Sequence, residues 1–337
     1  MLVRQRNGTE SSVKPDSEQA EQERPREGPL AKFAGAVPPA PEWFTNAVAS
    51  GYETRFVRVN GARIHYQSWS SSKKPGLLLV HGNGAHAHWW DFIAPYFAKS
   101  FNVVAMTFSG MGESDWRDTY DMDTFCEEQI AVCEATGMFD HEVKPTIVAH
   151  SFGGFVTILT GARYGHRLAG TVIVDSPVNP PDRDIGRRPR TIRGNRIYPD
   201  LNTALSRFRL APPQPCENDY VLDYIARWSL KQVDNERGKG WCWRFDPDIW
   251  QRFDFGRPGS ELLKATACRI ALFRGEDSEI FPDEVKDYMQ QLLDRNVPFV
   301  SIPHAHHHVM LDQPLAFIAA LRTLLEDWDH SAPNRQT

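Results

Sequence analysis

Ser151 stands among very small residues in the stretch VAHSFGG, from Val148 to Gly154. An apolar run precedes this serine, and a helix-compatible segment follows it. Ala149, Gly153 and Gly154 suit a backbone that turns too sharply for larger side chains, as the Gly-x-Ser-x-Gly nucleophile elbow requires. A glycine-rich helix start with an incidental serine is the alternative. The pattern favours the elbow, in which Ser151 is a nucleophile that attacks acyl groups.

A second glycine-rich stretch, HGNG at 81–84, directly follows the apolar run LLLV. Acyl transfer develops negative charge on the carbonyl oxygen of the substrate, and backbone N–H groups must stabilise this charge. We expect these donors from Asn83 and from Phe152, directly after the serine. Gly82 and Gly84 let this loop pass close to the substrate, so we expect both at the binding site. An ordinary glycine-rich strand-to-helix turn is the alternative.

Histidines crowd into the stretch IPHAHHHVMLDQP, where an apolar run ends. His307 stands seven residues before Pro314, which begins the last amphipathic segment. This spacing selects His307 as the base that accepts the Ser151 proton and later delivers it to the leaving group. We expect the remaining histidines of this stretch to be wall or surface residues: His304, His306 and His308.

Short, continuous apolar runs recur through the chain, at 76–80, 101–108, 145–150, 170–175, 268–273 and 298–302. Strands buried on both faces have this pattern, which predicts a parallel sheet covered by helices. Helical patterns lie between the runs. We therefore predict an α/β fold with a mostly parallel, doubly wound sheet. Ahead of these runs, alternating residues around Asn60-Gly61 predict a β-hairpin.

The domain organisation follows from one interruption of this alternation. Residues 177–258 contain no buried-strand pattern and are too long for a simple connection. We expect an inserted helical cap there, over the carboxyl edge of the sheet, where open α/β sheets bind ligands. The core then comprises 41–176 and 259–330. The largely polar ends, 1–40 and 331–337, are predicted to be disordered tails.

The motifs HGNG, SGMGESD, AHSFGG and HHHVMLDQP occur in this order. Together they resemble the motifs of the α/β-hydrolase fold, and the resemblance covers residues from about 50 to 328. It implies a serine hydrolase with a cap, which cleaves a carboxylic ester or related acyl bond through an acyl-enzyme intermediate. It implies neither a cofactor nor a metal ion.

The carboxylate that should orient His307 is harder to assign. Many members of this family carry it after the next-to-last core strand, as Gly-x-x-Asp-x-x-x-Pro. The corresponding stretch here, FRGEDSEIFP, has Ser278 at that position, flanked by Asp277 and Glu279. Other members place the acid after the preceding core strand, about 24 residues past the nucleophile, which gives Asp175. We favour Asp175, with its two rivals left open.

Composition limits the partners and the compartment. The chain has 337 residues and a net charge of −5, which gives no indication of a nucleic-acid partner. No apolar run approaches the ~18–20 residues of a membrane span. The 5 cysteines form no Cys-x-x-Cys pair and read as reduced thiols, so we expect a cytoplasmic protein that acts on a small molecule. The sequence does not indicate the oligomeric state.

Aromatic residues suggest a partly apolar substrate. Trp89 and Trp90, close to the HGNG stretch, are expected to line the site. The cap adds three further candidates in the stretch WCWRFDPDIW, with packing of the cap on the core as the alternative: Trp241, Trp243 and Trp250. The segment 182–196 contains six Arg and two Asp, and it either steers an anionic substrate or is a solvated loop.

Other functions fit parts of the sequence. HAHWWD at 86–91 resembles a zinc-hydrolase motif but lacks its final histidine. Epoxide hydrolases and haloalkane dehalogenases share the fold but use an aspartate at the elbow. A lactone or C–C bond hydrolase could use the same three residues. A small-molecule binding protein without turnover is an alternative of a different class.

Overall fold

The computed structural model describes residues 27–70, 73–183, 196–236, 238–254, 256, 259–294 and 297–331. The predicted tails therefore lie outside the described residues at 1–26 and 332–337, as does most of the arginine-rich segment.

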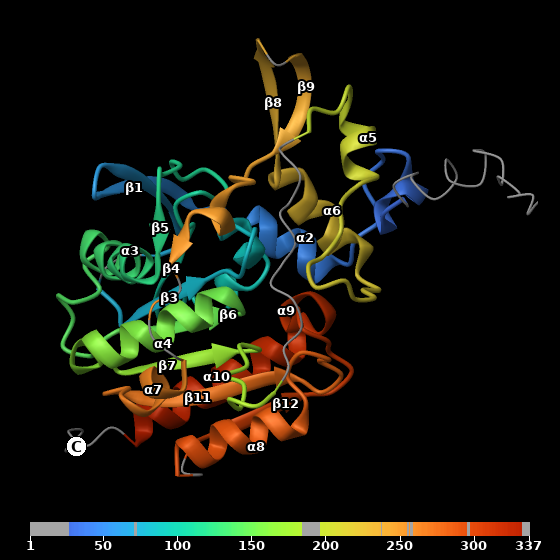
Figure 1. Ribbon diagram of the computed structural model, residues 1–337. Helices are drawn as coiled ribbons and strands as arrows, with labels where there is room; N and C mark the ends of the chain where they lie inside the picture. Colours follow the sequence, from blue (N-terminus) through green and yellow to red (C-terminus); the bar gives the residue numbers. More distant parts are fainter. Residues whose placement is uncertain are drawn as a thin grey trace, which may run out of the picture.

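A central sheet organises the fold, in the order β1-β2-β4-β3-β6-β7-β11-β12 (Figure 1). β1 and β2 pair in antiparallel fashion around Asn60-Gly61, where both residues have positive φ, and β2 is antiparallel to β4. All other neighbours in this sheet are parallel. The strand bounds are β1 (Glu53–Val59), β2 (Ala62–Ser68), β3 (Gly76–Val80), β4 (Asn102–Met106), β6 (Thr146–His150), β7 (Gly170–Val174), β11 (Arg269–Gly275) and β12 (Phe299–Ile302). The predicted hairpin and the mostly parallel sheet are confirmed.

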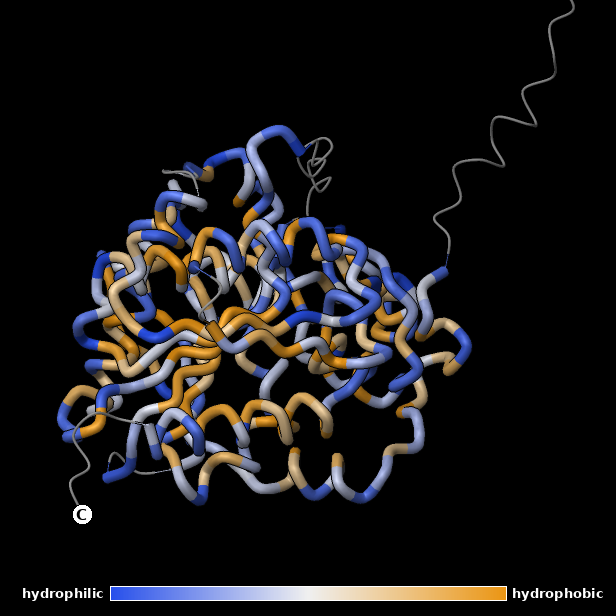
Figure 2. The backbone as a smooth tube through the Cα atoms, turned by 90° about the horizontal axis from the view of Figure 1, so that it is seen from below, coloured by the Kyte–Doolittle hydropathy of each residue, from blue (hydrophilic) through white to orange (hydrophobic). Residues whose placement is uncertain are grey.

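The parallel strands send alternate side chains into two separate apolar layers, which is why their sequences are apolar throughout. Leu78 and Ile147 belong to one layer, whereas Leu77 and Val148 belong to the other. The strongly apolar segments lie at the centre of the fold in Figure 2. This burial fixes the register of the strands, because a shift by one residue would exchange the two faces.

Helices cover both layers. The layer of Leu78 contains side chains of α3 (Met122–Ala135), α4 (Phe152–Tyr164), α7 (Gly259–Lys264) and α8 (Asp283–Leu292). The opposite layer contains side chains of α2 (Glu42–Ala49), η3 (Ala87–Trp90), η4 (Ala94–Tyr96), α9 (Val309–Asp312) and α10 (Pro314–His330). Two short elements complete the core, namely β5 (Tyr120–Asp121) and η5 (Gly165–Arg167). The arrangement is the doubly wound α/β architecture expected from the sequence.

We call the described residues 177–183, 196–236 and 238–254 the cap. It contains α5 (Leu201–Leu205), α6 (Asp219–Trp228), β8 (Leu230–Asn235), β9 (Gly238–Trp243), η6 (Ile249–Gln251) and β10 (Phe253–Asp254). The sequence predicts a helical cap, but the cap also contains strands. β8 and β9 pair as an antiparallel hairpin that projects from the molecule (Figure 1). Most residues of this hairpin are exposed or half-buried, so the criterion of a continuous apolar run misses it.

The predicted extent of the N-terminal tail is wrong for residues 27–40. Pro29–Phe33 form the short helix η2, in which the Leu30 side chain is 2% exposed. The Gly28 N–H donates a 2.7 Å hydrogen bond to the Ser206 carbonyl of the cap. This segment is rich in Ala, Gly and Pro and has no helix or strand periodicity, but one buried leucine and a backbone hydrogen bond dock it onto the cap.

In the part of the chain that the structure describes, no helix is long and apolar enough to cross a membrane. The thiols of all five cysteines are free.

Candidate active site

Ser151 occupies a sharp turn between β6 and α4. Its backbone has φ 53° and ψ −121°, a left-handed conformation that costs free energy in a residue with a Cβ atom. A Cβ atom on Gly153 would collide with the His81 carbonyl oxygen, and one on Gly154 would collide with the Ser176 side chain. The small residues around Ser151 are therefore required by close packing of the elbow against neighbouring strand ends.

His307 lies in the loop between β12 and α9, with its side chain 3% exposed. Its Nε2 atom is 2.8 Å from the Ser151 hydroxyl oxygen, a hydrogen-bonding distance. These residues are 156 positions apart in the sequence, and the parallel sheet brings them together because both follow the carboxyl ends of strands.

Asp175 directly follows β7 and is fully buried. Its Oδ1 atom lies 2.8 Å from His307 Nδ1, so Ser151, His307 and Asp175 form one hydrogen-bonded chain. The Gly275 N–H donates to Asp175 Oδ2 at 2.8 Å, and the Ser278 hydroxyl donates to Oδ1 at 2.7 Å. These donors compensate for the burial of the carboxylate.

The rival acids lie elsewhere. Asp277 and Glu279 are exposed, whereas Ser278 between them is 5% exposed and turned inward to Asp175. Sequence reasoning noticed Ser278 only as a missing carboxylate. Its role as a hydrogen-bond donor to the acid on the neighbouring strand was missed.

Two further histidines surround His307 at short range. His150 Nε2 donates to the His307 carbonyl oxygen at 2.9 Å, and His308 Nδ1 donates to the Gln214 side-chain oxygen at 2.7 Å. Burial, and then the proximity of His307, holds the pKa of both His150 and His308 well below the ordinary value. Both rings are therefore neutral at pH 7. His306 lies apart from this group, with Nδ1 3.3 Å from Asp312 Oδ2.

The HGNG loop runs beside the nucleophile. A Cβ atom on Gly82 would lie 3.0 Å from Ser151 Cβ, and Gly84 has φ +65°, which favours glycine. Phe152 begins α4, so its N–H lies at the positive end of the helix dipole. Among the described residues, neither the Asn83 N–H nor the Phe152 N–H has a hydrogen-bond acceptor. Both groups are available to an oxyanion.

A pocket of about 230 Å³ lies between this loop and the cap. Asn83, Gly84 and Trp89 line it from the core, as does His308, the residue next to His307. The cap wall consists largely of apolar side chains, which include Phe208, Leu210, Trp243, Phe245, Ile249 and Trp250. The predictions for Gly84 and Trp89 therefore agree with the position of the pocket, and cap tryptophans Trp243 and Trp250 also line it.

The prediction that Trp90 lines the site is wrong. Its side chain is 0% exposed and packs against Phe317 of α10, with ring centroids 6.2 Å apart. Adjacent residues of the short helix η3 point in different directions, so that Trp89 reaches the pocket while Trp90 enters the core. The remaining cap candidate, Trp241, is not among the residues that line the pocket.

A buried charged group connects the core to the cap. His88 Nδ1 is 2.8 Å from Asp91 Oδ2, and His88 Nε2 is 3.2 Å from Glu113 Oε2. Burial alone would lower the pKa of His88, but the hydrogen bonds that its ring donates to these carboxylates raise the pKa above the ordinary value. Trp228, at the end of α6, stacks on the His88 ring with ring centroids 3.6 Å apart and planes 9° apart. The Tyr224 hydroxyl of α6 donates to Asp91 Oδ2 at 2.7 Å.

The HAHWWD stretch is thus engaged in contacts with the cap. His86 Nε2 lies 2.9 Å from the Ser229 hydroxyl, at the start of the hairpin. Within the described ranges, no group of three or more His, Cys, Asp or Glu residues is arranged to hold a metal ion.

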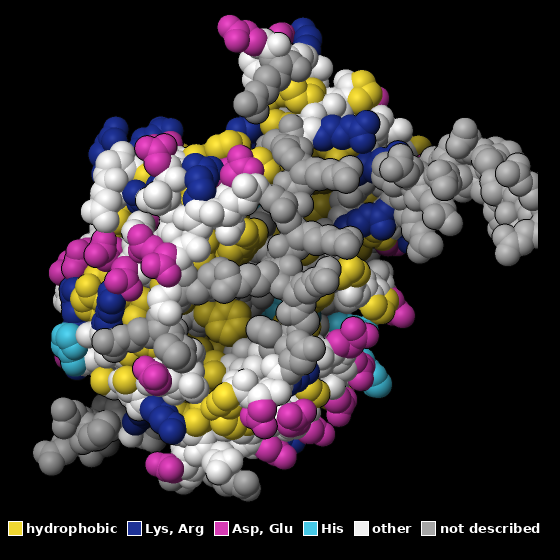
Figure 3. Space-filling view, viewed as in Figure 1, with side chains coloured by type: hydrophobic (Ala, Val, Ile, Leu, Met, Phe, Trp, Pro, Cys, Tyr) yellow, Lys and Arg dark blue, Asp and Glu magenta, His cyan; other side chains and the backbone are white. Residues whose placement is uncertain are grey.

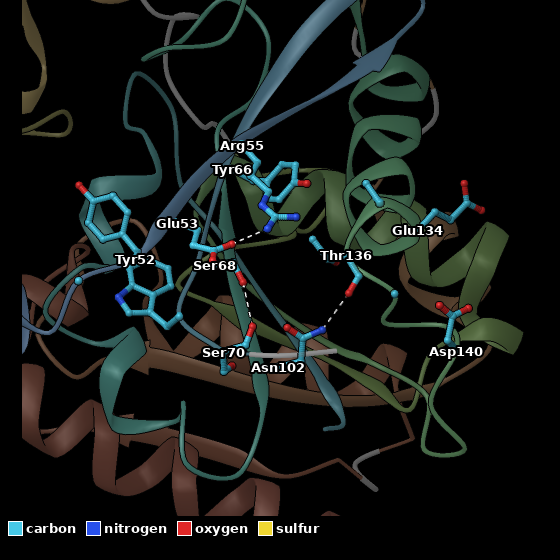
Figure 4. Close-up of a pocket in the computed structure, with 14 residues that line it drawn as sticks. Tyr52, Glu53, Arg55, Tyr66, Ser68, Ser70, Asn102, Glu134, Thr136 and Asp140 are labelled. Carbon is cyan, nitrogen blue, oxygen red and sulfur yellow. Dashed lines mark hydrogen bonds and ion pairs between the residues drawn. The ribbon is translucent and has the colours of Figure 1, made fainter. Parts of the chain in front are cut away.

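A larger hollow, of about 860 Å³, lies away from these residues (Figure 4). It includes Asn102 at the amino end of β4, whereas Ser151 follows the carboxyl end of β6. Several of its polar side chains are already paired: Arg55 with Glu53 at 2.6 Å, and Asn102 with the Thr136 carbonyl at 3.0 Å. The smaller pocket is the better candidate for a substrate site because it is lined by Asn83 and Gly84 of the HGNG loop and by His308, the residue next to His307.

Comparison with known families now identifies the class of protein. A family model described as the alpha/beta hydrolase family matches residues 77–321. This match covers most of the chain, and the chain belongs to this family.

The names of individual relatives state different reactions, among them epoxide hydrolysis, ester hydrolysis and dioxygenation. Epoxide hydrolase 1 of Caenorhabditis elegans is 28% identical over 165 residues, which is 48% of this chain and 36% of that protein. The bifunctional esterase/perhydrolase DCH of Acinetobacter calcoaceticus is 24% identical over 268 residues, with 74% of this chain and 90% of that protein covered. The chain thus spans only about a third of the length of the first epoxide-hydrolase relatives.

The fold also matches solved structures. The esterase Rv0045c from Mycobacterium tuberculosis has a TM-score of 0.61 at 20% identity, with 94% of this chain and 100% of that chain covered. The thioesterase domain from the curacin biosynthetic pathway has a TM-score of 0.67 at 20% identity, covering 82% of this chain and 99% of that one. At this identity the likeness concerns the fold.

Proposed function

We propose that the protein is a serine hydrolase that cleaves a carboxylic ester or related acyl bond of a small, partly apolar substrate. The observation that carries this proposal is the hydrogen-bonded chain from Ser151 Oγ through the His307 ring to Asp175 Oδ1, with 2.8 Å at each step. A nucleophile, a base and an orienting acid in this order are the groups that acyl transfer needs.

In the proposed reaction, Ser151 Oγ attacks the substrate carbonyl while His307 Nε2 takes the hydroxyl proton. The same nitrogen then delivers the proton to the leaving alcohol, which leaves an acyl group on Ser151. A water molecule, deprotonated by His307, attacks this acyl-enzyme and releases the acid. Asp175 keeps a proton on His307 Nδ1 and stabilises the imidazolium that forms twice in the cycle.

The developing oxyanion would be held by the Asn83 and Phe152 N–H groups. Removing one such donor typically costs about 10²–10³ in kcat. Gly82 supports this assignment, since its lack of a side chain lets the loop come within contact of Ser151.

Ester chemistry is favoured over epoxide opening by the residue at the elbow. The epoxide hydrolases that share this fold use an aspartate there, whose carboxylate attacks the epoxide carbon. Here the position holds Ser151, which His307 contacts directly. A lactone or C–C bond hydrolase needs the same three residues, and only substrates distinguish it from an esterase.

A substrate panel tests the proposal. It contains p-nitrophenyl acetate, butyrate and octanoate, a lactone, an amide and styrene oxide, each assayed with the native protein and Ser151→Ala. We expect turnover of short esters that the Ser151→Ala variant lacks, and no opening of styrene oxide. Binding of the esters without turnover would favour the binding-protein alternative, and epoxide opening that survives Ser151→Ala would refute the proposal.

A further inference from the structure

The pocket beside Ser151 carries an uneven charge. Of the described residues that line it, Arg207 and Arg209 are basic and none is acidic. His308 adds no charge at pH 7, since burial lowers its pKa well below the ordinary value. An apolar cavity with arginines on one wall suits a substrate with an apolar body and an anionic end.

Arg207 and Arg209 belong to one strip of the cap wall that follows α5. Within this strip, Phe208 and Leu210 are buried, Arg207 is half-buried and Arg209 is exposed. The apolar side chains thus anchor the strip in the cap and leave the guanidinium of Arg209 in solvent at the pocket wall. On the face drawn in Figure 3, Lys and Arg side chains gather over the region of α5, whereas Asp and Glu side chains are frequent around α8.

Arg209 has no carboxylate partner among the described residues. The nearest acid that precedes Arg209 in the chain, Asp200, caps α5 by accepting from the Thr203 N–H at 2.7 Å and the Thr203 hydroxyl at 2.9 Å. A guanidinium that no described carboxylate pairs is available to pair with a ligand bidentately.

We propose that the pocket selects acyl substrates that carry an anionic group, such as a carboxylate, on the end remote from the scissile bond, and that Arg209 binds this group. This inference rests on the proposed function. The protein as a whole has a net charge of −5, so the average field does not attract anions. Selectivity for an anion must therefore come from the local arginines.

The size of the pocket limits the rest of the substrate. Drug-sized ligands occupy pockets of about 300–1,000 Å³, and this one is below that range at about 230 Å³. A short chain or one ring fills it. Because Arg209 is solvent-exposed, its ion pair is screened, and we expect an effect of about tenfold on kcat/KM, mostly through KM.

Matched ester pairs test the inference. One set places the charge on the acid part of the ester. It compares monomethyl succinate with methyl butanoate, monomethyl adipate with methyl hexanoate, and monomethyl suberate with methyl octanoate. The other places it on the alcohol, with 4-acetoxybutanoate against butyl acetate. We compare the kcat/KM ratio of anionic to neutral ester in the native protein and in Arg209→Gln, Arg209→Lys and Arg196→Gln. Arg196 is exposed in the cap but does not line the pocket, so it controls for the loss of one positive charge.

We expect a ratio above one for at least one pair. In Arg209→Gln this ratio should fall about tenfold, with smaller falls in Arg209→Lys and at 0.5 M NaCl, while Arg196→Gln should keep it. The inference is overturned if every ratio is at or below one, or if Arg209→Gln and Arg196→Gln change the ratio equally. Those results leave Ser151-dependent ester cleavage intact. If the native protein cleaves neither the neutral nor the anionic esters, the proposed function itself is overturned. Thermal unfolding of each variant verifies that it is folded.

Discussion

The Ser278 hydroxyl donates a 2.7 Å hydrogen bond to Asp175 Oδ1, the same oxygen that lies 2.8 Å from His307 Nδ1. The acid and its supporting donor thus come from neighbouring parallel strands, β7 and β11. The position where many family members carry the acid has become a hydroxyl that supports the acid on the next strand. This arrangement makes the role of each residue testable by itself.

Asp175→Asn should lower kcat for ester cleavage by about 10³-fold or more, because the amide no longer fixes the His307 tautomer or stabilises the imidazolium. Steady-state kinetics with p-nitrophenyl butyrate measures this. Asp277→Asn and Glu279→Gln are matched controls at exposed positions and should each change kcat less than about twofold. A crippled Asp277→Asn with an active Asp175→Asn would show that the buried carboxylate is merely structural.

Ser278→Ala should have a much smaller effect, with kcat lowered about threefold to tenfold, since it removes one hydrogen bond of ~1 kcal/mol. Steady-state kinetics with p-nitrophenyl butyrate measures this change. An unchanged kcat would mean that Ser278 contributes nothing to the acid.

His307→Ala should lose at least about 10³-fold in turnover with the fold intact, as judged by circular dichroism and the melting temperature. His306→Ala should retain most activity, because the His306 ring faces Asp312 and not Ser151. If the two variants behaved in the opposite way, the base would have been misassigned.

His88 should make stability depend on pH. Its pKa is raised in the folded protein, so its contribution is fully present below the unfolded value of about 6.5 and is lost as pH rises through the folded value. Breaking a buried ion pair costs about 3 kcal/mol, and His88→Gln should lower the free energy of unfolding by about this amount at pH 5.5.

Urea unfolding of the native protein and of His88→Gln, at pH 5.5 and at pH 9.5, measures the difference. The comparison between the two proteins isolates His88 from the buried histidines with lowered pKa, such as His86 and His150. The difference in the free energy of unfolding between the two proteins should be smaller at pH 9.5 than at pH 5.5. A gap that is constant or widens would show that His88 is not charged in the folded state.

The sequence alone was sufficient to predict the α/β sheet and the residues that meet at its carboxyl edge, because buried strands and strained turns constrain residue types strongly. The small residues around Ser151 indicate the nucleophile, spacing selects His307 and Asp175, and the structure brings the three side chains together. Contacts of single side chains across the fold were less accessible. Trp90 was expected at the site since it adjoins Trp89, but the short helix η3 directs it to Phe317.

Two errors have a common physical origin. Residues 27–40 and the β8–β9 hairpin have little apolar periodicity, because few of their side chains are fully buried. Tertiary contacts, such as buried Leu30 and the Gly28 hydrogen bond to Ser206, order the first segment without leaving a local pattern. Such contacts are not encoded within a window of neighbouring residues.

Covalent labelling tests the central claim most directly. The native protein is treated with a fluorophosphonate, and the site and stoichiometry of modification are read by peptide mass spectrometry alongside residual ester turnover. We expect one adduct per chain, on Ser151, that forms in proportion to the loss of activity. The adduct should be absent from Ser151→Ala, and it should form much more slowly in His307→Ala. Full ester turnover by a protein that carries the adduct on Ser151, or by a folded Ser151→Ala variant, would contradict it.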